Sequence, residues 1–217
     1  MLKKTKEEIK LKTPVFNVVE KEFENTSFKP VGLNCNDWVM LIAADASSRE
    51  NPVCVFVEQT RWGAEAKTIE FPCGTVEDFE MTTPPLVGYD DAIKEIRKRA
   101  AIREFEEETG IDLGPYKERV GLLGTFNPNP AYFNNSMTIF CVKVPDLLNR
   151  FENRKKQSLD ENEDCKVFVD RVMNRYWDLS SHAMGIAALQ KMAITPVDAL
   201  DYYETKTIPI QPNDNKD

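Results

Sequence analysis

Apolar residues gather in short runs along this chain, and most of the runs have the length and composition of β-strands. The clearest two, residues 38–44 and 53–59, flank a polar segment as in a β-hairpin. Further short strands are predicted at residues 15–23, 28–31, 65–72, 120–126, 137–144 and 165–169. Paired strands with helices between them indicate a layered α/β or α+β domain.

Helical patterning is confined to residues 92–109 and 183–192. Asp90 or Asp91 can cap the start of the first helix. Gly110 lies where a left-handed residue commonly ends a helix. The charged residues at the start of the chain, 1 to 12, predict a tail or a short helix, and the Pro-, Asn- and Asp-rich end predicts fraying.

Three glutamates crowd one face near the end of the first predicted helix. Glu104, Glu107 and Glu108 stand at i, i+3 and i+4, where like charges oppose helix formation by ~0.2–0.5 kcal/mol per pair. Clustered hard oxygens suit Mg²⁺ or Mn²⁺, and Arg103 can reach Glu107 one turn further on. The pattern predicts a metal-binding helix.

Composition and charge narrow the class of protein. The 217 residues are 41% hydrophobic and 29% charged, as in an ordinary globular protein with a buried core. The formal net charge of −8 argues against broad nucleic-acid binding, which needs a basic surface. Because there is no run of about 18 apolar residues and no apolar stretch behind the charged N-terminus, we expect neither a membrane span nor a secretory signal.

Cysteine and histidine usage limits the available chemistry. The chain has five scattered cysteines without a C-x-x-C pair, which favours reduced thiols and a cytoplasmic location. The single histidine, His182, is expected to be a packed or surface residue. Any catalysis must therefore depend on carboxylates.

The glutamate cluster is part of a longer motif. Residues 103–111 (REFEEETGI) resemble the second half of the Nudix box, and residues 74–80 (GTVEDFE) resemble its first half, a glycine, five residues and a glutamate. The resemblance implies a hydrolase that cleaves a nucleoside diphosphate linked to another group. It also implies an α/β/α sandwich with a mixed central sheet.

The two halves of the motif are further apart than in the family pattern. Seven residues usually separate the glutamate from the arginine, but Glu80 and Arg103 enclose 22 residues, 81–102, so 15 are extra. Glu95 stands at the usual distance from Arg103 but has Tyr89 in place of the glycine. We favour the split motif, and either Glu80 or Glu95 can be its first glutamate.

The insertion, at about residues 81–99, raises a packing problem. On one straight helix, Ile93, Ile96 and Ala100 fall on the same side as the three glutamates. We expect either a kink near Ala100 or an apolar flap that lines the substrate cleft and adjusts which nucleotide fits. A passive surface excursion is the alternative.

The residues before the motif resemble one branch of the family, the ADP-ribose pyrophosphatases. Residues 59–63 (QTRWG) and 70–74 (EFPCG) match its Gln-x-Arg and Glu-x-Pro-x-Gly run. The resemblance implies that Arg61 and Glu70 help to hold the substrate, and a guanidinium group matches two diphosphate oxygens. An exposed arginine at a strand end is the alternative for Arg61. Trp62 is a candidate to stack on adenine, or else a core residue.

Two later loops complete the candidate site. Residues 126–135 (FNPNPAYFNN) stand where this branch has a proline-containing loop, and a proline there, here Pro130, accompanies ADP-ribose as substrate. In the acidic run before the last strand, the resemblance suggests Glu163, with Glu161 and Asp164 as neighbours, as a carboxylate that activates water or binds a metal. The alternative for residues 126–135 is an ordinary stiff turn, and the alternative for the acidic run is a solvated loop.

The resemblance also implies a metal site. Mg²⁺, or Mn²⁺, would be bound by Glu104, Glu107 and Glu108 and by the backbone carbonyl of Cys73, while Arg103 would orient Glu107. Cys73 as a small buried thiol is compatible with this role.

The resemblance divides the chain into three parts. Residues 1–35 are similar to the N-terminal strand region that takes part in a homodimer in the relatives. Residues 36–208 would form the Nudix domain, and residues 209–217 a frayed tail.

Three functions fit these observations. The favoured one is an Mg²⁺-dependent pyrophosphatase that hydrolyses ADP-ribose to AMP and ribose 5-phosphate, or acts on a similar nucleoside diphosphate derivative. The first alternative applies the same chemistry to a nucleotide sugar, NADH or a dinucleoside polyphosphate. The second is a Nudix fold that senses a nucleotide without turnover. A damaged motif would favour the sensor, but Arg103 and the three glutamates are all present.

Overall fold

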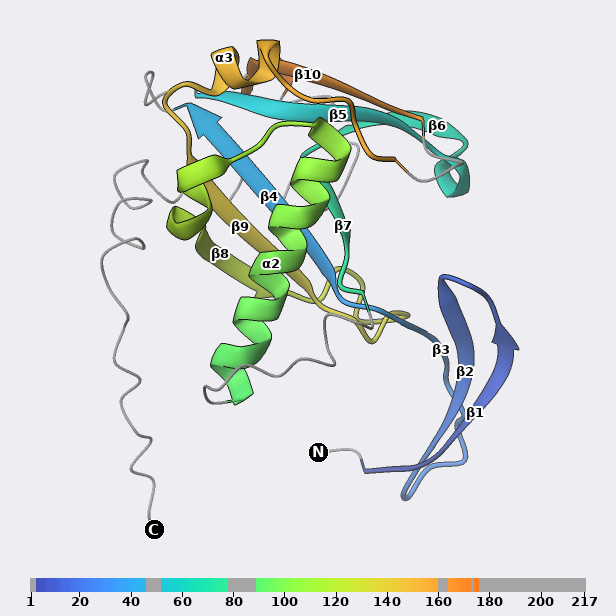
Figure 1. Ribbon diagram of the computed structural model, residues 1–217. Coiled ribbons are helices and arrows are strands. Elements are labelled where there is room, and N and C mark those ends of the chain that lie inside the picture. Colours follow the sequence, from blue (N-terminus) through green and yellow to red (C-terminus); the bar gives the residue numbers. More distant parts are fainter. Residues whose placement is uncertain (1–2, 46–51, 78–88, 160–163, 173, 176–217) are drawn as a thin grey trace.

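The computed structural model describes residues 3–45, 52–77, 89–159, 164–172 and 174–175 (Figure 1). Within these ranges the chain forms a three-stranded sheet at its N-terminal end and a seven-stranded sheet that carries the helices. The predicted mixture of helices with a mixed central sheet is confirmed. None of the described helices has the length and apolar character needed to cross a membrane.

The N-terminal sheet is an antiparallel meander of β1 (Lys4–Lys12), β2 (Phe16–Phe23) and β3 (Val31–Cys35). The prediction of a tail or short helix for residues 1–12 is wrong, because most of them form β1. Every residue of β1 is exposed, so its backbone pairing with β2, rather than burial of an apolar face, holds it in place. The strand expected at residues 28–31 begins only at Val31.

The larger sheet has the strand order β10-β5-β4-β9-β8, with β6 paired to β5 and β7 paired to β4. Its described pairs are antiparallel except for β4 with β9. The predicted hairpin is confirmed, because β4 and β5 pair antiparallel. The strand bounds are β4 (Trp38–Asp45), β5 (Val53–Arg61), β6 (Ala66–Glu70), β7 (Cys73–Thr75), β8 (Gly121–Phe126), β9 (Met137–Lys143) and β10 (Cys165–Arg171).

Helix α2 (Tyr89–Thr109) crosses one face of this sheet as a single helix. Ile96, Ala100 and Phe105 are buried in the core between the helix and the sheet. The described part of the insertion is therefore packed helix rather than an apolar flap. No kink is needed to separate the apolar residues from the glutamates, because the helix first packs on apolar side chains and then on the backbone of β7.

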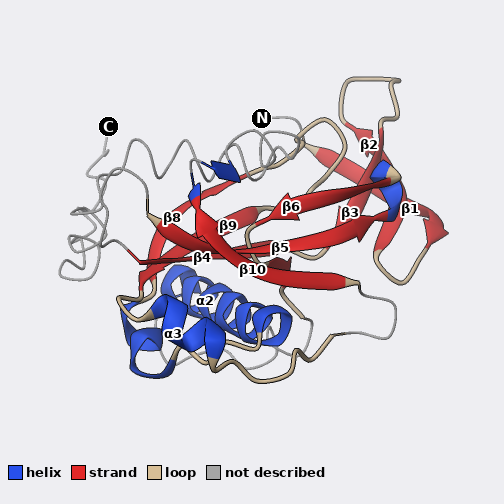
Figure 2. Ribbon diagram, turned by 90° about the horizontal axis from the view of Figure 1, so that it is seen from above, coloured by secondary structure: helices blue, strands red, loops and turns tan. Residues whose placement is uncertain are grey.

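Two short helices, α3 (Leu147–Glu152) and the 3₁₀ helix η2 (Gly114–Arg119), lie on the same face as α2, whereas the 3₁₀ helix η1 (Trp62–Ala64) connects β5 and β6. Figure 2 shows α2 and α3 on one side of the sheet, and η2 packs Tyr116 against the same core. A second apolar cluster, which includes Phe56 and Phe71, is buried on the opposite face. The helix predicted at 183–192 lies outside the described residues, as do the predicted tail and His182.

Gly110 ends α2 as predicted and fixes the chain that follows. Its φ is +69°, and its N–H donates to the carbonyl of Glu106 at 2.9 Å. The N–H of Lys155 donates to the carbonyl of Gly110, also at 2.9 Å. A Cβ at Gly110 would lie 2.1 Å from the carbonyl oxygen of Lys155. Glycine is therefore required both for conformation and for space.

Replacing Gly110 by alanine is expected to lower the free energy of unfolding by at least about 1–3 kcal/mol, since a left-handed alanine is strained and its Cβ meets a backbone oxygen. Gly114→Ala is the matched control: its φ is +54°, but its Cβ would meet only the Arg150 side chain at 3.4 Å. Urea unfolding followed by circular dichroism should show the smaller loss for Gly114→Ala. Equal losses would contradict the close packing of residues 110 and 155.

Candidate active site

The site begins where α2 meets β7. A Cβ on Gly74 would lie 2.1 Å from the carboxyl carbon of Glu104, so glycine leaves the room in which this carboxyl group lies. The N–H of Thr75 donates to Glu104 Oε1 at 3.2 Å, and the N–H of Cys73 donates to Glu108 Oε2 at 3.0 Å. Two of the three predicted glutamates are therefore fixed by the strand backbone.

Arg103 joins the remaining glutamate to this contact. Its guanidinium donates to Glu107 Oε2 at 2.8 Å and to the carbonyl of Thr75 at 3.0 Å. The same group lies 3.0 Å from Glu104 Oε1. Arg103 does reach Glu107, as the helical spacing predicts, and it also bridges Glu107 to Glu104.

Burial gives Glu104 an unusual protonation equilibrium. Removal from water raises the pKa of its carboxyl to about 7, with the charge of Arg103 opposing this rise and the charge of Glu107 adding to it. The ionised form of Glu104 is thus costly where no cation besides Arg103 compensates it. A carboxylate in this state is well suited to receive a further positive charge.

The donor set fits a hard divalent cation by its chemistry, because it offers carboxylate oxygens beside a strand backbone. Within the described residues, however, no three carboxylate, thiol or imidazole groups are already arranged around one point that could hold a metal. Arg103 instead pairs with both Glu104 and Glu107. Binding of a cation would require these side chains to rearrange.

A second polar group lies beside the first. Arg61, at the end of β5, donates to both carboxylate oxygens of Glu70 at 2.8 and 2.6 Å. Glu70 is fully buried and also accepts the hydroxyl of Thr68. Burial lowers the pKa of Arg61, but the hydrogen bonds and charge of Glu70 outweigh it, so the net pKa is raised. Arg61 is thus a fixed cation with 39% of its side chain exposed.

Cys73 connects the two groups. Its thiol donates to Glu70 Oε2 at 3.5 Å, and the guanidinium of Arg61 lies 3.7 Å from its sulfur. Its own N–H is bound to Glu108. Burial raises the pKa of this thiol well above its usual value, and Glu70 and Glu108 add to the effect. The thiol is therefore neutral and acts as a spacer between the carboxylates.

The other predicted residues are placed less directly. Trp62 is 78% exposed, so it is not a core residue. Pro130 is exposed in the loop between β8 and β9. Glu163, Glu161 and Glu80 lie outside the described residues, whereas Asp164 is described and exposed. The sequence interpretation missed Thr68, although its position two residues before Glu70 on β6 places both side chains on one face of the strand.

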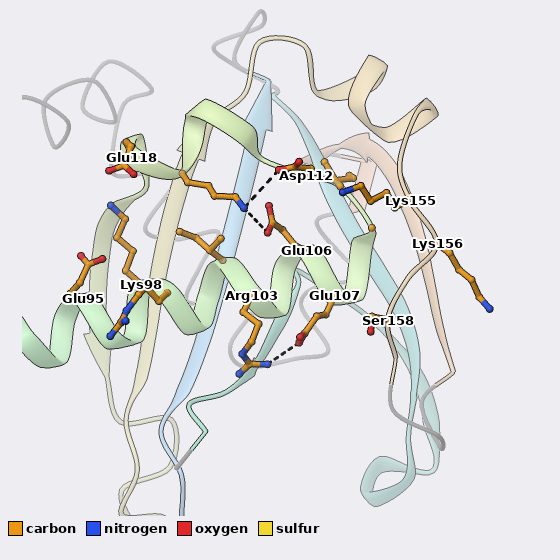
Figure 3. Close-up of a pocket in the computed structure, with 15 residues that line it drawn as sticks. Glu95, Lys98, Arg103, Glu106, Glu107, Asp112, Glu118, Lys155, Lys156 and Ser158 are labelled. Atoms are coloured by element: carbon orange, nitrogen blue, oxygen red, sulfur yellow. Dashed lines mark hydrogen bonds and ion pairs between the residues drawn. The ribbon is translucent and has the colours of Figure 1, made fainter. Parts of the chain in front are cut away.

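The outer face of α2 carries a pocket of about 690 Å³, and Arg103 and Glu107 of the candidate site are among its lining residues (Figure 3). Lys98, Lys155 and Glu95 also line this pocket. Glu95 therefore stands on the outer face of the helix, away from the contact of Glu104 with β7. Its part as the first glutamate of the motif stays open beside that of Glu80.

Comparison with known proteins identifies the fold. No protein-family model matches the chain, and no curated protein sequence matches it. Among solved structures, an ADP compounds hydrolase is similar over 89% of this chain and 92% of that chain, with a TM-score of 0.57 and 16% sequence identity. This likeness supports the fold independently of the motif.

In metal-free protein, stability should depend on pH through Glu104. Because its folded pKa is about 7 rather than 4.5, the native state holds more protons than the unfolded chain between these values. The free energy of unfolding should therefore fall as pH rises through this window, by up to about 3 kcal/mol. Glu104→Gln should remove this component, which urea unfolding in EDTA at a series of pH values would measure.

Glu118→Gln is the control for this pH series, because Glu118 is an exposed carboxylate on η2. It should keep the wild-type slope of stability against pH. If Glu104→Gln also kept that slope, Glu104 would not be the buried carboxylate described above.

Proposed function

We propose that the protein is a metal-dependent hydrolase of Nudix type that cleaves nucleoside diphosphate derivatives, with ADP-ribose as its main substrate. The products would be AMP and ribose 5-phosphate. The observation that carries this proposal is the convergence of Glu104, Glu107 and Glu108 with Arg103 at Gly74. The fold likeness to an ADP compounds hydrolase supports the substrate class.

The three glutamates, with the backbone carbonyl of Cys73, would hold Mg²⁺ or Mn²⁺. A bound divalent cation neutralises diphosphate charge and lowers the pKa of a bound water. Arg103 would release Glu104 and keep Glu107 oriented through its other donor groups. Glu163 is the proposed carboxylate that accepts the proton of the attacking water.

Substrate binding is proposed for the neighbouring polar group. Arg61 presents a fixed positive charge held by Glu70, and its partly exposed guanidinium can bind phosphate oxygens. Trp62 is the next residue along the chain and is exposed, so its ring is free to stack on adenine. Pro130 is proposed to favour ADP-ribose over other derivatives.

A homodimer is proposed through the N-terminal sheet. Ile9, Leu11 and Val31 on this sheet are more than half exposed, and a partner subunit would bury them. A cytoplasmic location is proposed on account of the five cysteines, none of which forms a disulfide within the described residues.

The direct test is hydrolysis of a panel of nucleoside diphosphate compounds with Mg²⁺. Wild-type protein should release AMP from ADP-ribose, and Glu107→Gln should lower kcat/KM by more than ~100-fold, because a metal-binding carboxylate is lost. Glu152→Gln, which changes an exposed carboxylate on α3 that does not line the pocket beside Arg103 and Glu107, should behave like the wild type.

Other results would reassign the function. Faster cleavage of a nucleotide sugar, NADH or a dinucleoside polyphosphate would keep the chemistry and replace ADP-ribose as the main substrate. If nothing were cleaved while one compound raised the melting temperature, the protein would be a nucleotide sensor instead.

A further inference from the structure

The loop between β8 and β9, residues 127–136, contacts the start of β4 in the larger sheet and also contacts the N-terminal sheet. Leu33 of β3 accepts a hydrogen bond from the N–H of Asn134 at 3.2 Å and donates its own N–H to Tyr132 at 2.7 Å. The ring of Phe133 lies 5.6 Å from that of Trp38, the first residue of β4. The loop that carries Pro130 is thus anchored along its second half.

Asp37, just before β4, joins this loop to two other segments. Its Oδ1 accepts the N–H of Ser136 at 2.8 Å and the hydroxyl of Ser136 at 3.0 Å. Its Oδ2 pairs with Arg97 of α2, and its carbonyl accepts the N–H of Val76 at 2.9 Å. One residue therefore connects the end of the loop, the first half of α2 and the chain that follows β7.

Arg97 lies on the part of α2 that belongs to the insertion. It precedes Glu104 by seven residues, about two helical turns, so both side chains point to the same face of the helix. A displacement of the loop that pulled on Arg97 would act on the helix face that carries Glu104. The ion pair thus links the loop to the candidate active site through one rigid element.

The ion pair between Arg97 and Asp37 is partly buried, so water screens it less than it screens a surface salt bridge. The side chains of Arg97 and Asp37 are only 21% and 30% exposed. A cavity of about 310 Å³ separates this part of α2 from β8 and β9; its lining residues are Ile93, Lys94, Arg97, Leu122, Thr125 and Thr138. Beside the buried Ala92 and Ile96, the ion pair is therefore a further contact that holds this part of α2 in place.

We propose that Asp37 and Arg97 are positioning residues through which the insertion braces the loop 127–136 and so sets the substrate selectivity of the enzyme. Neither residue needs to contact the substrate. The selectivity part of this proposal rests on the proposed hydrolase function, whereas the brace itself can be measured without turnover.

The brace is tested by amide hydrogen exchange in full-length Arg97→Gln and Asp37→Asn. Exchange of Ser136 and of the loop around it should become at least about 5-fold faster than in the wild type in both variants, because the clasp that protects the Ser136 N–H is weakened. Arg97→Lys should restore most of the protection, since it keeps the charge. Arg99→Gln, on an exposed position of the same helix, is the matched control and should leave loop exchange unchanged.

Selectivity is tested in the same variants. The ratio of kcat/KM for ADP-ribose to that for the next-best substrate should change by about 5-fold in Arg97→Gln through KM, with kcat nearly constant. Arg97→Lys and Arg99→Gln should keep the wild-type ratio.

The outcomes separate the two levels of the proposal. Wild-type exchange rates in both Arg97→Gln and Asp37→Asn would overturn the brace. Faster loop exchange with an unchanged substrate ratio would overturn the positioning role. If the wild type hydrolysed none of the compounds, the proposed function would fail, and the exchange rates alone would support or overturn the brace.

Discussion

The carboxyl group of Glu104, near the end of α2, occupies the space that a Cβ at residue 74 of β7 would take. This contact replaces apolar packing by hydrogen bonds from two strand N–H groups to Glu104 and Glu108. These hydrogen bonds have two consequences. The strand end satisfies its backbone donors, and two carboxylates are held in fixed positions on a helix that otherwise packs through Ile96, Ala100 and Phe105.

The same contact creates the electrostatic character of the site. Glu104 is held largely out of water beside Glu107, and Arg103 is the cation that compensates both. A buried carboxylate near few positive charges lowers the stability of the folded protein. Such unfavourable buried charges are often found at functional sites. Cys73 extends the arrangement toward Arg61 and Glu70, so the proposed metal site and the proposed diphosphate site share one strand end.

The pattern of apolar residues was sufficient to predict the elements that bury those residues, and insufficient for the others. Strands β4 and β5 and helix α2 were predicted because apolar residues define them, whereas β1 has no buried residue and depends on a partner strand. The expectation of a kink or a flap, which arose because Ile96 and Glu104 share one helix face, was wrong. The sequence does not show that backbone N–H groups of β7 lie opposite Glu104. The Asp37–Ser136 contact joins residues 99 positions apart and has no local signal.

The proposed hydrolase function requires that a divalent cation bind among the glutamates of α2 beside β7. Titration of ¹⁵N-labelled protein with Mn²⁺ tests it most directly, since the paramagnetic ion broadens the amide signals of nearby residues. Signals of residues 73–75 and 104–108 should broaden most strongly, at Mn²⁺ concentrations that leave those of β1 sharp. Broadening centred on residues 112–118, or no localised broadening, would contradict it.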